Sequence, residues 1–158
     1  MILAFHRVCL LLGSNIQPER NIPLAIYLLK KQVKVTRTSS TWESAAVGSN
    51  GPNMLNAAVM INTSLDLADL KEKLVHPLEN QLGRVRTQDK NAPRTIDIDI
   101  ILYDKQVVEP ALWEYAFRAV PVAQLAPELL SADGETLIMV AQQLAKSTPI
   151  WIRKDVVI

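Results

Sequence analysis

The sequence predicts an α+β domain in which helices pack on one face of an antiparallel sheet. Three observations predict it: a short apolar run that stops at a glycine, apolar positions at helical spacing in two later segments, and a strict alternation of apolar and acidic residues at 96–100. The 158 residues, 49% of them hydrophobic, are enough for one core, so we expect a single domain spanning residues 1–158.

The first strand and the first helix follow from local patterns. Residues 1–7 precede the apolar run Val8–Leu12, and we interpret them as the approach to that strand. The run ends in a Gly-Ser-Asn sequence, which is typical of a buried strand that enters a tight turn. A helix then begins near Pro18, because proline is favoured in a first helical turn, and apolar residues recur at helical spacing as far as Leu29.

The middle of the chain predicts two extended segments and a second helix. Residues 33–42 and 54–61 have strand composition, and residues 44–53 between them are dense in Gly, Pro, Asn and Ser, which predicts a mobile loop. Leucines at helical spacing predict an amphipathic helix over 66–82, ended by a glycine. Pro77 inside this helix removes a backbone donor and should kink its last turn.

The remaining segments complete the order of elements. Residues 96–103 predict a strand and residues 135–146 a late helix, whereas the Val/Ile-rich tail 149–158 could add a strand, cover a site or meet a partner. The order strand, helix, strand, strand, helix, strand is that of a ferredoxin-like βαββαβ sandwich with an additional C-terminal helix.

Charge and cysteine content exclude several classes of protein. The formal net charge is +1, so the chain has no global field that would hold a nucleic acid or an anionic membrane. The single cysteine excludes a disulfide framework, which suits a reducing compartment. The N-terminal residues lack the pattern of a cleaved signal peptide, and no apolar stretch is long enough to span a bilayer. We therefore expect a cytoplasmic, monomeric protein whose partners are small molecules.

The most informative pattern is the pair Asp97 and Asp99. Alternation along a strand sends the isoleucines at 96, 98 and 100 to one face and both carboxylates to the other. Two neighbouring carboxylates repel one another unless they are well solvated or share a hard cation, and Mg²⁺ takes one or two carboxylates together with water and phosphate oxygens. The pattern fits a magnesium site, and it also fits an ordinary acidic strand face.

Three arginines surround this pair in the sequence. Arg84 and Arg86 share one side of an extended stretch, and Arg94 precedes Asp97 by three residues. The planar fork of a guanidinium suits phosphate oxygens, and metal-binding acids beside phosphate-binding arginines are what phosphoryl transfer requires. The alternative is that these arginines form salt bridges with Asp97, Asp99 and Glu79 and bind no ligand.

Five ordered blocks of sequence resemble a known family. They are Leu12-Gly13-Ser14-Asn15, Ser39-Ser40, Asn56-Ala57-Ala58-Val59, Gly83-Arg84-Val85-Arg86 and Ala92-Pro93-Arg94-Thr95-Ile96-Asp97-Ile98-Asp99-Ile100-Ile101-Leu102. In order and spacing they resemble the signature of 6-hydroxymethyl-7,8-dihydropterin pyrophosphokinase, or 2-amino-4-hydroxy-6-hydroxymethyldihydropteridine diphosphokinase. The resemblance covers residues 8–146. It implies a ferredoxin-like core and transfer of pyrophosphate from Mg-ATP to the hydroxymethyl group of a reduced pterin in folate biosynthesis, with release of AMP.

The resemblance also implies roles for individual residues. Asp97 and Asp99 would hold two Mg²⁺ ions, and Arg84 and Arg94 would act with them in catalysis. The side chains implied at the ATP site are His76, Glu79, Arg84, Arg86 and Arg94. The residues implied at the pterin site are Ser44, Val47, Met54, Asn56 and Phe117. Within this set the Asn56 amide would pair with the pyrimidine edge, Phe117 would stack on the ring, and Met54 would stand where the family usually has an aromatic residue.

One departure separates this sequence from the family pattern. The loop after the Asp-containing strand is about seven residues shorter than is usual, and the family's histidine and arginine are absent between Asp99 and Phe117. A catalytically weakened paralogue that binds a pterin or a nucleotide is therefore an alternative. An RNA-binding domain shares the βαββαβ order, but the central strands lack the exposed aromatic residues that such a domain uses.

Overall fold

Strand β1 (His6–Ser14) lies at the centre of a seven-stranded sheet in the computed structural model, which describes residues 4–158. It pairs antiparallel with β4 (Met54–Thr63) on one side and with β5 (Asp97–Tyr103) on the other. Beyond these run β3 (Trp42–Ser44), β7 (Ile150–Ile152) and β6 (Gln106–Val107), and β2 (Lys34–Thr38) also pairs with β4. The predicted ferredoxin-like order and antiparallel pairing are confirmed.

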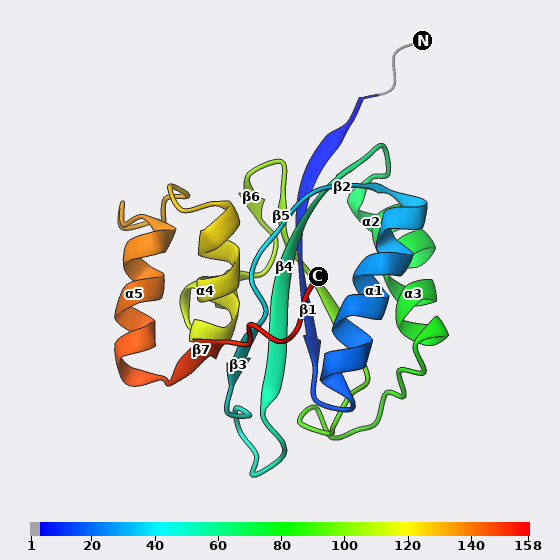
Figure 1. Ribbon diagram of the computed structural model, residues 1–158. Helices are drawn as coiled ribbons and strands as arrows, with labels where there is room; N and C mark the ends of the chain where they lie inside the picture. The colour runs from blue at the N-terminus through cyan, green and yellow to red at the C-terminus, as the bar shows by residue number, and fades with distance from the viewer. Residues whose placement is uncertain (1–3) are drawn as a thin grey trace.

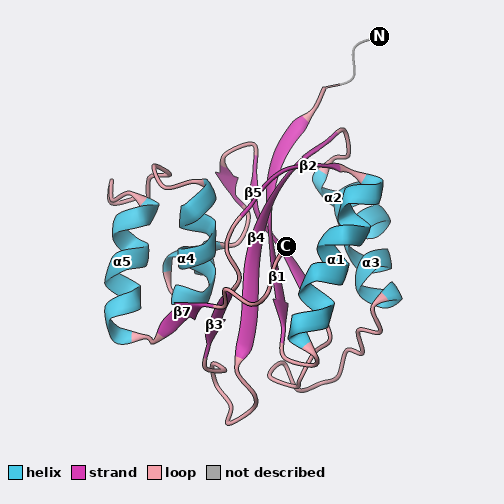
Figure 2. Cartoon of the chain, viewed as in Figure 1, coloured by secondary structure: helices cyan, strands magenta, loops and turns pink. Residues whose placement is uncertain are grey.

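Helices cover both faces of this sheet, so the prediction that they lie on one face is wrong (Figure 1). On one face pack α1 (Pro18–Gln32), α2 (Leu67–Leu70) and α3 (His76–Gln81), the helices of the predicted order. On the other face pack α4 (Ala116–Leu125) and α5 (Leu137–Ser147), drawn on the left of Figure 2. The physical reason is visible in β1, where Val8 and Leu10 join one apolar core while Cys9 and Leu11 join the other.

The helix predicted over 66–82 forms, with one irregularity. Asp66 caps it by accepting a hydrogen bond from the Asp69 N–H, and α2 and α3 are joined by a π-helical turn, Lys71–Val75, in which the His76 N–H donates to the Lys71 carbonyl. Pro77 follows at once. Because proline has no N–H and its ring crowds the preceding turn, the wider turn gives it room. The disturbance predicted at Pro77 takes this form.

Of the three helices and strands after residue 115, one was predicted, one was left open and one was missed. Helix α5 occupies nearly the predicted range, with Thr136 as its N-cap. The tail adds β7 at the edge of the sheet beside β3. It then returns to the core that contains Val8 and Leu10, where Val156 is buried. Helix α4 was missed. No helix within residues 4–158 is long and apolar enough to cross a membrane.

Candidate active site

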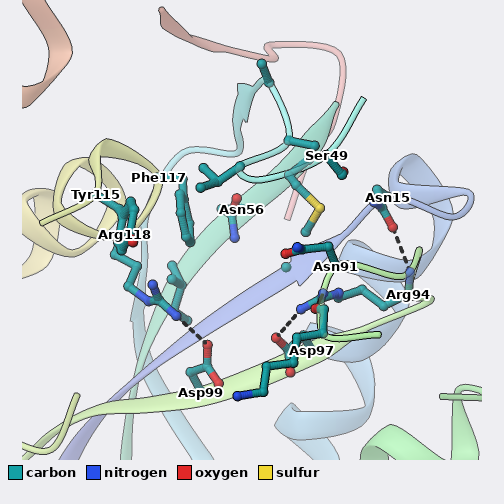
Figure 3. Close-up of a pocket in the computed structure, with 17 residues that line it drawn as sticks. Asn15, Ser49, Asn56, Asn91, Arg94, Asp97, Asp99, Tyr115, Phe117 and Arg118 are labelled. Carbon is teal, nitrogen blue, oxygen red and sulfur yellow. Dashed lines mark hydrogen bonds and ion pairs between the residues drawn. The ribbon is translucent and has the colours of Figure 1, made fainter. Parts of the chain in front are cut away.

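The site lies where the end of β1 meets the starts of β4 and β5. Because these strands are antiparallel, Gly13, Asn56 and Asp97 fall in adjacent register positions at the same end of the sheet. The loop after β3 and the first turn of α4 close the sides of a cavity of about 400 Å³ (Figure 3). Its lining combines apolar, amide, cationic and acidic groups: Leu11, Gly13, Asn15, Ala45, Ala46, Val47, Ser49, Met54, Asn56, Lys90, Asn91, Arg94, Asp97, Asp99, Tyr115, Phe117 and Arg118.

The two carboxylates stand on one face of β5, as the alternation predicts. The isoleucines at 96, 98 and 100 are buried in the core on the opposite face, whereas Asp97 and Asp99 open toward the cavity. Burial, and then repulsion from Asp97, raises the pKa of Asp99 to about 6. Because the two negative charges repel one another, a cation that reaches both carboxylates stabilises the pair.

Three cavities meet at this pair. The first is the 400 Å³ cavity already described, the second, of about 270 Å³, contains His76, Glu79 and Arg86, and the third, of about 310 Å³, contains Arg84 and Arg94. Asp97 and Asp99 line all three. The carboxylates therefore sit at the junction of a cleft, with the residues predicted for ATP on one side and most of those predicted for the pterin on the other.

Two of the three predicted arginines lie against Asp97. Arg94 Nη1 donates to Asp97 Oδ2 at 3.0 Å, and Arg84 Nη2 lies 3.9 Å from Asp97 Oδ1. The Arg94 backbone N–H donates to Asn15 Oδ1 at 2.7 Å, which ties the segment before β5 to the end of β1. The Nε atoms of Arg84 and Arg94 are buried and have no hydrogen-bond partner among the described residues. Open donors of this kind indicate a place for an anionic ligand.

The third arginine is held by a buried glutamate. Arg86 Nη2 donates to Glu79 Oε1 at 2.8 Å, and the other oxygen, Oε2, accepts a hydrogen bond from the Ile98 N–H at 3.0 Å. Burial raises the pKa of Glu79, whose residue is only 2% exposed. Glu79 thus fixes the backbone of β5 between the two aspartates. Of the salt bridges considered from the sequence, those to Asp97 and Glu79 form, whereas none of the three arginines pairs with Asp99 among the described residues.

The residues predicted for the pterin mostly gather in the first cavity. Met54, Asn56, Val47 and Phe117 line it. Asn56 is buried: its Nδ2 donates to the Leu12 carbonyl at 3.4 Å, and its Oδ1 has no partner among the described residues. Ser44 is buried in β3, directly before the loop that forms one wall, and is not part of the lining.

Gly13 makes room for this arrangement. A Cβ atom at Gly13 would lie 2.8 Å from Asn56 Nδ2, closer than such atoms approach one another. The absence of a side chain at position 13 therefore lets the Asn56 amide lie across β1 and present its free oxygen to the cavity.

Several lining residues were left out of the site predicted from the sequence, although ligand contact by Tyr115 was weighed equally with packing and Arg118 was noted as a cation near the shortened loop. Asn15 and Asn91 supply amides, and Tyr115 and Arg118 come from the beginning of α4. Figure 3 shows Arg118 pointing from α4 toward Asp99, where its Nη2 lies 3.8 Å from Oδ2. Asn15 belongs to one of the blocks that carry the family resemblance, and Arg118 directly follows Phe117. Both signals were available, but neither spacing nor periodicity marks these residues as partners of a strand 20 to 80 residues away.

The donor set fits Mg²⁺ only with help from a substrate. Within residues 4–158 no group of three or more His, Cys, Asp or Glu side chains converges to hold a metal ion. The Asp pair alone offers hard oxygen ligands from one or two carboxylates, which is what Mg²⁺ takes when phosphate oxygens and water complete its shell. The open guanidinium donors beside the pair suit those same phosphates.

Comparisons with known proteins agree with this geometry. The family model described as 7,8-dihydro-6-hydroxymethylpterin-pyrophosphokinase matches residues 9–127, a range that contains the whole cavity lining. The chain belongs to this family. The family predicted from the sequence is thereby confirmed, and the pyrophosphokinase activity predicted with it agrees with the description of the family.

Individual relatives in this pyrophosphokinase family support the assignment. The 2-amino-4-hydroxy-6-hydroxymethyldihydropteridine pyrophosphokinase of Synechocystis sp. is 32% identical over an alignment that covers 92% of this chain and 80% of the relative. The protein of the same name from Bacillus subtilis is 36% identical, covering 75% and 77%. A mitochondrial folate synthesis bifunctional protein of Pisum sativum is 31% identical over 81% of this chain and 27% of its own length.

Proposed function

We propose that the protein transfers the pyrophosphoryl group of ATP to the hydroxymethyl oxygen of 6-hydroxymethyl-7,8-dihydropterin, releases AMP and so serves folate synthesis. The observation that carries this proposal is the junction of the three cavities at Asp97 and Asp99. A reaction between a phosphate donor and a flat heterocyclic acceptor needs both substrates to meet at one cation-binding point, and family membership supplies the identity of the two substrates.

On the acceptor side, the cavity offers what a pterin requires. The free Oδ1 of Asn56 accepts from, and its Nδ2 donates to, the pyrimidine edge of the ring. Phe117 stacks on one face of the ring and the polarizable sulfur of Met54 contacts the other. The backbone at Val47 and the Ser44 hydroxyl add hydrogen bonds once the loop after β3 closes on the ring. These contacts orient the hydroxymethyl group toward the Asp pair.

On the donor side, arginines bind the triphosphate. Arg84 and Arg94 donate to phosphate oxygens through the fork that includes their unpartnered Nε atoms. Arg86 breaks its ion pair with Glu79, or keeps it while also contacting the nucleotide. His76 and Glu79 line the nucleotide side of the cleft. Surrounded by these three arginines, the phosphates are held in line with the acceptor oxygen.

Asp97 and Asp99 would hold two Mg²⁺ ions against the phosphates, and the bound cations would neutralise charge on the transferred group. The carboxylates serve this role in their ionised form, so Asp99 gives up its proton when the site fills.

The step itself exchanges one oxygen–phosphorus bond for another. The hydroxymethyl oxygen attacks the β-phosphorus, the new O–P bond forms, and the bond from the β-phosphorus to the α,β-bridging oxygen breaks, so AMP leaves with that electron pair. The hydroxyl proton passes to water. Positioning and charge neutralisation by the residues named above carry most of the rate, as is usual for phosphoryl transfer.

The test is to incubate the purified protein with Mg-ATP and the pterin and to identify the nucleotide product. AMP formed in proportion to pterin supports the proposal, whereas ADP would mean ordinary kinase chemistry. Tight pterin or nucleotide binding without any product would establish instead the weakened paralogue considered from the sequence.

We also propose that one domain, residues 1–158, performs this reaction as a cytoplasmic monomer. The near-neutral charge of +1 supports a protein whose partners are small molecules rather than a nucleic acid or a membrane. Light scattering of the purified chain tests the monomer, and a mass of two or more chains would overturn it.

A further inference from the structure

The guanidinium of Arg118 enters the cleft and has no hydrogen-bond partner among the described residues. The side chain is only 18% exposed, and within residues 4–158 it makes no hydrogen bond. Asp99 Oδ2 lies 3.8 Å from its Nη2, and its Nε is buried and has no hydrogen-bond partner in the part of the chain that the structure describes. A guanidinium cannot lose its charge, and a buried N–H donor such as this Nε is costly to leave without an acceptor. The arrangement indicates that an anion belongs there.

Arg94 and Arg86 of the cleft are more fully engaged than Arg118. Arg94 donates to Asp97 at 3.0 Å and to the carbonyls of Lys90 and Ala92, and the largely exposed Arg86 binds Glu79. Arg84 resembles Arg118 but lies beside Asp97, on the nucleotide side of the cleft. Arg118 is therefore the open guanidinium that faces the acceptor side.

The position of Arg118 is fixed by aromatic rings. Its Cζ lies 4.8 Å from the centroid of the Phe117 ring and 5.6 Å from that of Tyr115. Figure 3 shows the side chain running beside Phe117 to reach Asp99. Stacking against these rings orients the guanidinium plane without using its N–H donors. The group thus lies between the ring proposed to hold the pterin and the carboxylate proposed to hold the cation.

We propose that Arg118 binds the pyrophosphoryl group during its transfer, an inference that rests on the proposed function. When the substrates are bound, its guanidinium exchanges the long contact with Asp99 for two hydrogen bonds to non-bridging oxygens of the β-phosphate. These oxygens face the acceptor while the bond to AMP breaks and the bond to the hydroxymethyl oxygen forms. The contact is strongest at that stage, so it contributes to kcat more than to substrate binding.

This role compensates for the shortened loop. Between Asp99 and Phe117 the only basic residue is Lys105, so the loop offers neither arginine nor histidine to the phosphates. Arg118 supplies the missing charge from the first turn of α4, a helix anchored through Ala116 and Ala119 in the same core as Cys9 and Leu11. A cation on a packed helix is held in place before the substrates arrive and loses little freedom when they bind.

The test compares Arg118→Met and Arg118→Lys with the matched control Arg20→Met, because Arg20 is an exposed arginine of α1 outside the cleft. We expect Arg118→Met to lower kcat about ten- to a hundredfold, the loss of a charge-assisted contact, while the KM for the pterin changes less than about threefold. Arg118→Lys should recover part of kcat, since it restores the charge but not the fork. The thermal midpoints should match, and Arg20→Met should behave as the wild type.

Two outcomes would overturn the assignment of Arg118. One is an unchanged kcat in Arg118→Met; the other is a rise in the pterin KM alone, which would mean that Arg118 only supports the Phe117 ring. If the wild type forms no AMP, the proposed function fails, and calorimetry with Mg²⁺ and inorganic pyrophosphate then tests Arg118 by itself. We expect Arg118→Met to bind pyrophosphate at least about tenfold more weakly. Equal affinity would refute the inference.

Discussion

Arginine meets carboxylates in two regions of this molecule, and the two regions are built in opposite ways. After β7, Arg153 uses all three guanidinium nitrogens: two bonds at 2.8 Å reach Asp155, one at 2.6 Å reaches Glu43, and one at 3.4 Å reaches Glu19. Around the Asp pair, Arg84 and Arg118 approach carboxylates only to 3.9 and 3.8 Å, and each keeps a buried Nε that has no partner among residues 4–158.

The difference separates a structural cluster from a binding site. The hydrogen bonds that Arg153 donates to Asp155 and Glu43 raise its pKa above the usual value, and together with Glu19 these groups join the tail to β3 and α1. Its donors are satisfied within the fold. In the cleft, Arg84 and Arg118 instead lie too far from their carboxylates for hydrogen bonds, which is the condition of a site whose ligand brings the missing acceptors.

The largest effect should come from removing a carboxylate of the pair. Asp97→Asn or Asp99→Asn is expected to lower the rate of AMP formation about a thousandfold or more, because the cation that neutralises the phosphates loses a charged ligand. The thermal stability of Asp99→Asn should stay the same or rise, since repulsion between the two carboxylates is relieved. Product analysis and thermal melting measure both quantities. Near-normal turnover in either variant would refute the metal site and erase the contrast with Arg153.

A pair of arginine substitutions tests the comparison directly. Arg84→Met should weaken ATP binding about ten- to a hundredfold with little change in thermal midpoint. Arg153→Met should do the reverse, lowering the midpoint while kcat at saturating substrate persists. Steady-state kinetics and thermal melting of both variants measure the kinetic effect and the thermal midpoint of each. If both lose mainly stability, the open donors of Arg84 have no functional meaning.

The pH dependence of stability should distinguish Asp99 from an ordinary surface carboxylate. Burial raises its folded-state pKa from 3.8 to about 6, so between these values the folded chain binds more protons than the unfolded chain. The contribution of Asp99 to the free energy of unfolding therefore falls as pH rises from about 4 to about 6. Asp99→Asn should lack this contribution.

Urea unfolding of the wild type and of Asp99→Asn across that pH range measures the difference. Identical pH profiles would mean that Asp99 is not perturbed in the ligand-free protein. Because a proton competes with the cation for Asp99, we also expect Mg-ATP-dependent activity to decline below about pH 6.

A smaller effect is expected from Gly13→Ala on the acceptor side. The new methyl group would meet Asn56 Nδ2 at 2.8 Å and displace the amide that is proposed to read the pterin. The pterin KM should rise about fivefold, the value of one neutral hydrogen bond, with ATP binding unchanged. Kinetics with each substrate varied in turn will separate the two. An unchanged pterin KM would mean that the pyrimidine edge of the pterin does not bind at Asn56.

The central part of the fold was predictable because its patterns are local. Alternation in β5 predicted both the buried isoleucines and the paired carboxylates, and the uniform apolar run of β1 predicted a buried strand. The same run also indicated helices on both faces of the sheet. A strand with one face in solvent alternates apolar and polar residues, whereas this run is apolar throughout. Helix α4 was missed because it is buried on nearly all sides, so it lacks an amphipathic period, and because Pro121 lies inside it.

The site was predictable only as far as it is carried by motifs. Asp97, Asn56 and Arg94 lie in blocks with recognisable sequence, and the fold brings them together. The position of Arg118 depends on how α4 packs against the second core, and no spacing in the sequence encodes that contact. Glu79 was predicted as a nucleotide-side residue, but its hydrogen bond to the Ile98 N–H requires the register between a helix and a strand.

That register depends on the π-helical turn Lys71–Val75. Residues four apart in an α-helix drift by about 40° around its axis, so leucines at 70, 74 and 78 would rotate progressively away from the core. A π-helical turn contains more residues than the 3.6 of an α-helical turn, so it reduces this drift. The three leucines therefore stay buried, at 0%, 2% and 0% exposure. It thereby sets the rotational phase at which Glu79 meets β5. Removing a single residue from this turn would swing Glu79 by about 100° away from Ile98, although every catalytic side chain would still be present in the chain.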